Sequence, residues 1–147
     1  MDSPFRPIRN NHRTILNHSC VLLNFGPQLF LLFKEQIHMA MTEIGKFTLH
    51  NGGGFVARGE VSYLDDNGEK HLSGNAGDIL LGQTKDVDPD KLGVPDGSIV
   101  SLYVFVVWGT DNEARQSFIY KKGSPVVANY TITGTTLSNT LGLISVG

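Results

Sequence analysis

The sequence has little cysteine and little charge, and both shortages exclude classes of protein. Its 147 residues include one cysteine, Cys20, so neither an intramolecular disulfide nor a Cys-rich zinc site can form. Charged residues make up 18% of the chain and the formal net charge is -2, which removes the broad electrostatic argument for a nucleic-acid partner. The apolar run at residues 21–33 is interrupted by Asn24, Gly26 and Pro27 and is too short for a transmembrane helix.

The composition changes near residue 40, which divides the chain into two unlike parts. Residues 1–40 carry four basic and two acidic side chains, whereas residues 41–147 carry eight basic and 12 acidic ones. The second part also holds the glycine-rich runs and most of the turn residues. We therefore predict an N-terminal tail at residues 1–40 and one folded domain at residues 41–147.

Three interpretations of the tail stay open. It can be a disordered or partly helical terminus, or a segment that resembles a targeting sequence. It can also be upstream sequence translated from a misassigned start, because Met39 and Met41 both offer later starts. In that case the functional protein contains no cysteine. No clear signal peptide is present, so the localisation is unknown, and the protein is either cytoplasmic or released without such a signal.

The second part has the alternation and turn chemistry of strands. Apolar residues occupy every other position from Phe55 to Tyr63, which is typical of a half-buried strand. Asn67-Gly68 follows and predicts a hairpin. Residues 100–108 are apolar on both faces, which predicts a central strand covered on both sides. About seven or eight such segments predict an all-β fold, a compact antiparallel β-sandwich.

The usual catalytic constellations are missing. His50 and His71 are the domain's only histidines, and neither Ser98 nor Ser124 lies in a nucleophile elbow. Gln83 stands where a phosphate-binding loop needs lysine. We therefore expect that the protein is not an enzyme and that it needs no cofactor.

An acidic loop at residues 86–97 offers the one candidate metal site. Its spacing resembles the start of a calcium loop, but Lys91 replaces the required glycine and Gly97 replaces the bidentate glutamate. A calcium site of another kind could be built from Asp86, Asp88, Asp90 and Asp96. The alternative is a solvated acidic loop with no ion.

The aromatic residues give a second candidate site. Trp108 ends the apolar strand, and Asp111 and Asn112 follow it closely. An exposed ring beside short polar side chains is how a shallow sugar site is built. Tyrosines and a tryptophan at one end of a sandwich equally suit a membrane interface, and the rings can also simply pack the core.

The domain from about Ile44 to the C-terminus resembles small β-sandwich proteins of the actinoporin-like group and the aegerolysins. The early strands from Phe47 to Tyr63, the strand ending in Trp108 and the Thr-rich segment 130–137 carry this resemblance. The group includes fungal fruit-body lectins and membrane-active cytolysins. The resemblance implies a β-sandwich that binds glycans or lipids, and we carry over none of the family's binding residues.

Together, these observations predict a non-enzymatic binding protein, a lectin-like or lipid-binding β-sandwich that acts in defence or in attack on other cells. Its partner would be a glycan or a membrane lipid, bound by loops at one end that include Trp108, Asp111 and Asn112. The first alternative is a membrane-damaging, pore-forming cytolysin of similar fold. The second is a structural or interaction module without a small ligand, which could form homo-oligomers through an exposed edge strand.

Overall fold

A computed structural model describes residues 41–147 of the chain. The chain divides into two units, residues 1–39 and Ala40–Gly147. The three interpretations of the N-terminal tail therefore concern residues that lie outside the described part. Within residues 41–147, we find no helix with the length and apolar character needed to cross a membrane.

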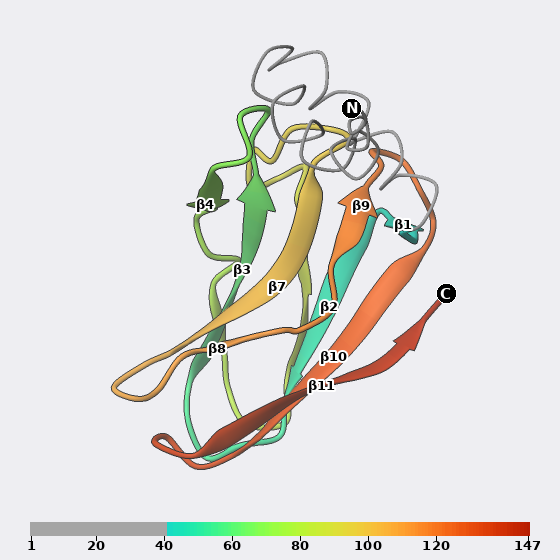
Figure 1. Cartoon of the computed structure of the whole chain (residues 1–147). Coiled ribbons are helices and arrows are strands. Elements are labelled where there is room, and N and C mark those ends of the chain that lie inside the picture. The colour runs from blue at the N-terminus through green and yellow to red at the C-terminus, as the bar shows by residue number, and fades with distance from the viewer. Residues whose placement is uncertain (1–40) are drawn as a thin grey trace, which may run out of the picture. The chain divides into compact units, whose positions relative to one another are not determined.

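The described residues form two β-sheets that face each other as a sandwich (Figure 1). The first sheet has the order β1 (Glu43–Ile44), β9 (Phe118–Tyr120), β7 (Ile99–Val106), β3 (Ala57–Leu64) and β4 (Lys70–Leu72), with β5 (Asp78–Ile79) paired to β3 and β8 (Asn112–Glu113) to β7. The second has the order β11 (Asn139–Val146), β10 (Val127–Gly134), β2 (Lys46–Asn51) and β6 (Thr84–Val87). This confirms the all-β sandwich. Most pairs are antiparallel, and β1–β9 and β2–β10 are parallel.

The core lies between the two sheets and follows the alternation of the sequence. Every second residue of β2, starting at Phe47, is buried, and β10 repeats the pattern from Ala128 to Ile132. The ring of Phe47 contacts Phe118 and Tyr130, with ring centroids 6.0 and 6.1 Å away. The contact with Phe118 joins the two sheets, and the contact with Tyr130 lies within the four-stranded sheet.

The central strand β7 departs from the prediction in two ways. Its inner face is buried, but its outer face is only partly covered, and Phe105 is 37% exposed beneath the guanidinium of Arg58. A two-layer sandwich has nothing to cover the outer face of a sheet, so the expectation of cover on both sides was wrong. The strand also ends at Val106, and Trp108 lies in the turn that follows.

Two turns test the sequence interpretation further. The Asn67-Gly68 hairpin is confirmed between β3 and β4, with Gly68 at a φ of 81°. The loop predicted from residue 86 begins later, because Asp86 and Val87 belong to β6 and pair with β2. Val87 is fully buried, and this burial is what extends the strand into the acidic segment.

Gly59 provides a direct test of how closely the two sheets pack. A Cβ atom built at Gly59 would lie 2.3 Å from Cγ2 of Val87 on the opposite sheet. We predict that Gly59→Val lowers the free energy of unfolding by about 1–3 kcal/mol, because overpacking forces side chains off their rotamers. Urea denaturation of the full chain measures this. Gly74→Ala is the control, since its Cβ would meet no atom within 4 Å; an equal loss in both variants contradicts the packing.

Candidate functional site

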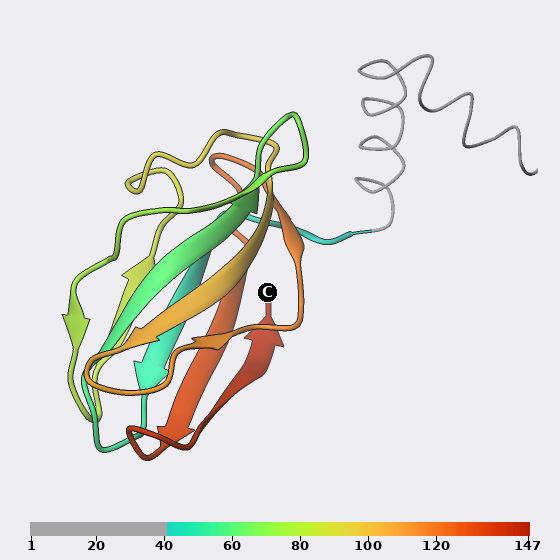
Figure 2. The same ribbon diagram turned by 60° about the vertical axis from the view of Figure 1, so that its left-hand side comes forward.

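Four loops meet at one end of the sandwich, and we call this end the loop end (Figures 1 and 2). The loops join β2 to β3, β5 to β6, β7 to β8 and β10 to β11, at residues 52–56, 80–83, 107–110 and 135–138. None of them contains an aspartate, glutamate, lysine, arginine or histidine. The loops at the opposite end, by contrast, carry Asp65, Asp66, Glu69, Asp88, Asp90, Lys91, Asp96, Lys121 and Lys122. The domain is therefore strongly polarised along its length.

Asn51, the last residue of β2, joins three of the chain segments at the loop end. Its side chain is fully buried, and its amide nitrogen donates to the carbonyls of Phe55 and Ile79 at 2.6 and 2.9 Å. Its side-chain oxygen accepts the amide of Gly53 at 2.9 Å. The backbone of Asn51 also exchanges hydrogen bonds with residues 82 and 83. A buried side-chain amide with all these partners fixes both the 52–56 loop and the 80–83 loop.

The other two loops pack against each other. The amide of Thr110 donates to the carbonyl of Thr136 at 2.9 Å, and the side chain of Asn139 donates to the carbonyl of Thr110 at 2.8 Å. Gly109 permits this approach, because a Cβ there would lie 2.2 Å from the oxygen of Thr136. The amide of Gly54 reaches the carbonyl of Gly134 at 3.3 Å, which links this pair of loops to the part that Asn51 holds.

Four large apolar side chains project from the loop end. The exposed fractions are 50% for Leu80, 64% for Leu81, 75% for Leu137 and 93% for Trp108. Trp108 has a φ of 61° and is the one non-glycine residue with a positive φ in the described part of the chain. That conformation is a strain for a bulky residue, and such strain clusters at functional sites. The indole is thus held out in solvent at a conformational cost.

The two polar residues predicted beside Trp108 bond within the protein. Asp111 accepts the hydroxyl of Tyr103 at 2.7 Å and the amide of Val106 at 2.9 Å. The hydrogen bond to Asp111 is the main cause that raises the pKa of Tyr103 to about 12. Asn112 donates to the side-chain oxygen of Asn139 at 2.8 Å. Both side chains fix the strands beside the Trp108 loop, and a role of theirs in binding a sugar stays a prediction.

The four aspartates proposed for calcium are separated by other contacts. Asp86 pairs with Lys46 at 2.5 Å and Asp90 with Lys122 at 3.4 Å. Asp88 accepts the amide of residue 90, and Asp96 accepts the amide of residue 122. Among the described residues, no three of these carboxylates have ligand atoms within reach of one another. Calcium binding stays a prediction that this arrangement does not support.

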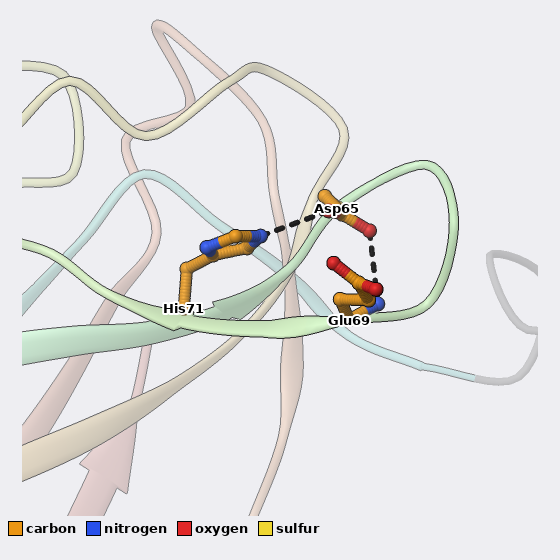
Figure 3. A group of neighbouring side chains, drawn as sticks. All are labelled: Asp65, Glu69 and His71. Atoms are coloured by element: carbon orange, nitrogen blue, oxygen red, sulfur yellow. Dashed lines mark hydrogen bonds and ion pairs between the residues drawn. The ribbon is translucent and has the colours of Figure 1, made fainter.

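A different group, which the sequence analysis missed, does have its ligand atoms together (Figure 3). Asp65, Glu69 and His71 lie in the β3–β4 hairpin, with ligand atoms within 4.8 Å of one another. Asp65 accepts the Nε2 of His71 at 2.8 Å and the amides of Asn67 and Glu69. The bond from His71 is the main cause that lowers the pKa of Asp65. His71 also stacks on Tyr63, with ring centroids 5.5 Å apart. These contacts close the hairpin, which accounts for the group without an ion.

No protein-family model and no curated protein matches the chain. Solved structures to which parts of the chain are similar include listeriolysin O (TM-score 0.39, 20% identity, 68% of this chain and 22% of that one) and the human-specific toxin intermedilysin (0.37, 21%, 70% and 23%). The membrane-binding domain of pneumolysin has a TM-score of 0.36 at 15% identity, covering 69% of this chain and 96% of that one. The chain spans under a quarter of the two whole toxins. Because these TM-scores are below 0.5, the similarities do not indicate a function for this chain.

Asn51 offers a test of how the loop end is held. We predict that Asn51→Ala lowers the free energy of unfolding by about 1–3 kcal/mol, because it leaves buried carbonyls and an amide without partners. Amide exchange should also speed up at Gly53. Denaturant titration and hydrogen exchange measure the two effects. Asn75→Ala is the control, because that exposed side chain accepts only the amide of Gly77. Unchanged exchange at Gly53 would show that Asn51 does not order the loops.

Proposed function

We propose that this domain is a non-enzymatic binding protein that attaches to lipid membranes through the loop end. The observation that carries the proposal is Trp108, which is 93% exposed and held at a φ of 61° on an end without charged loops. Strain of this kind costs of order 1–3 kcal/mol. In water, exposure of the indole does not offset this cost. At a membrane interface it can, because tryptophan is favoured there.

Burial of the apolar tips supplies the driving force for attachment. Full burial of one leucine side chain stabilises by roughly 1.5–3 kcal/mol, and Leu80, Leu81 and Leu137 are at least half exposed. The loop backbones already bond to one another, which limits the cost of removing their polar groups from water. A rigid uncharged end can therefore enter the interface without first unfolding.

The charge distribution indicates which membranes suit this end. The loops carry no charge, and residues 41–147 hold 12 acidic against eight basic side chains. Attraction to anionic lipid therefore contributes little, so attachment should occur on neutral phosphatidylcholine and should depend weakly on salt. A membrane-damaging cytolysin would use the same end, and leakage of a dye from the vesicles separates damage from attachment.

A glycan-binding role is the second candidate, and a polar groove favours it. The groove has a volume of about 400 Å³. It is lined by Asn112, Glu113, Arg115, Gln116, Asn139, Thr140, Leu141, Gly142 and Leu143. Amide, carboxylate and guanidinium groups beside two leucines are suited to a sugar with polar edges and an apolar face. Trp108 is not part of this lining, so the two candidate functions use different surfaces.

Substitution of Trp108 tests the membrane proposal. We predict that the full chain sediments with phosphatidylcholine vesicles, and that Trp108→Ala and Leu137→Ser each weaken this binding about tenfold, which corresponds to about 1.4 kcal/mol. Thermal stability of Trp108→Ala should change little, because the side chain is 93% exposed and its removal costs almost no packing. Leu72→Ser is the matched control, since Leu72 is 48% exposed but lies on β4, away from the loop end.

Two outcomes would contradict the membrane proposal. One is a wild-type chain that does not sediment with neutral vesicles. The other is an equal loss of binding in Leu72→Ser and Trp108→Ala. Binding to a glycan array that is unchanged by Trp108→Ala would favour the groove instead.

A further inference from the structure

Beyond its first residue, strand β11 has no strand partner on one side of its backbone; at that first residue the carbonyl of Asn139 accepts the side-chain amide of Asn112 at 3.4 Å. β11 is the outermost strand of its sheet and pairs only with β10. The amide of Thr135 donates to the carbonyl of Ser138 at the start of this hairpin. Bonds of an antiparallel pair alternate along the strand, so the backbone groups of Leu141 point away from β10; the register shifts after Leu143, opposite Asn129 and Tyr130. An additional strand could bond to the backbone groups of Leu141.

This edge differs from the other sheet edges of the described residues. The eight residues of β11 include no charged side chain and no proline. The opposite edge, β6, has four residues and carries Lys85 and Asp86, while β4 has three and carries Lys70 and His71. Short, charged edges resist pairing with other chains, whereas long, uncharged edges recruit another strand.

The side chains of β11 leave room for a partner. Ile144 is 62% exposed and Val146 is 38% exposed. A Cβ atom at Gly142, in the middle of the strand, would meet no atom within 4 Å. A second strand laid along this edge would therefore meet the backbone of residues 139–143, which also lines the polar groove, and would lie beside two apolar side chains.

We propose that the partner is a second copy of this chain, paired through β11 in the antiparallel direction. Two copies of an uncharged strand bring no like charges together. A two-fold axis makes one surface complementary to itself, and it joins the two four-stranded sheets into one. The surface that recognises the partner is thus the same in both copies.

The direction of pairing has a consequence that rests on the proposed function. β11 starts at the loop end, directly after the 135–138 loop, and runs away from it (Figure 2). An antiparallel pair therefore points its two loop ends in opposite directions. Such a dimer would bring two membranes together, because the two loop ends cannot both insert into one flat membrane.

Sedimentation velocity of the full chain without lipid tests the pairing. The wild-type chain should show a concentration-dependent dimer. Gly142→Lys should raise the dimer dissociation constant at least about tenfold, because it places two lysines near the pair's centre. Gly142→Ala is the neutral control and should dimerise as the wild-type chain does. Ile144→Lys gives a second charged variant in case the first does not fold, since Ile144 is exposed.

The outcomes distinguish the pairing from membrane attachment. A wild-type chain that stays monomeric, or a dimer unaffected by both lysine variants, overturns the proposal. Vesicle turbidity then tests the direction of pairing: bound wild-type chain should aggregate vesicles, and Gly142→Lys should bind without aggregating them. A dimer that binds vesicles but never aggregates them overturns the antiparallel arrangement. A dimer that forms in solution but binds no vesicle supports the pairing and contradicts only the proposed function.

Discussion

The loop end depends on one buried amide. Asn51 is the last residue of β2, and its fully buried side chain bonds to the backbone of residues 53, 55 and 79. An apolar residue could not bond these groups, and the bonds define where the chain turns from one sheet to the other. The adjacent loops then bond to one another, and this order gives the apolar tips fixed positions.

This constraint allows the two ends of the sandwich to differ. The charged loops at one end hold ion pairs and a hairpin closed by Asp65 and His71, which keeps that end in water. The four loops of the loop end contain no charged residue, and the tips of Leu80, Leu81, Trp108 and Leu137 project from hydrogen-bonded loops. Exposed apolar side chains add no stability to a folded monomer in water. We therefore expect the loop end to be the surface that binds a partner.

The sequence predicts those features that are local. Alternation located β3 and β7, and the Asn67-Gly68 pair located the hairpin. The sequence also singled out Trp108, which is exposed in the structure, and its role in binding stays a prediction. Features that depend on distant segments were not predictable. The parallel pair of β2 with β10 joins residues about 80 apart, and Leu80 and Leu137 reach the same end only through this topology. The sequence does not reveal that Asp111 already accepts a hydrogen bond within the protein, because the donor, Tyr103, lies on the other side of a turn.

The central claim is that Trp108 enters the lipid interface, and Trp108 is the chain's single tryptophan. The most direct measurement is therefore the intrinsic tryptophan fluorescence of the full chain with phosphatidylcholine vesicles that carry quenchers at graded depths. The account predicts an emission shift to shorter wavelength, with strongest quenching by labels near the interface. An emission spectrum that stays unshifted and unquenched while the protein sediments with the vesicles would contradict it.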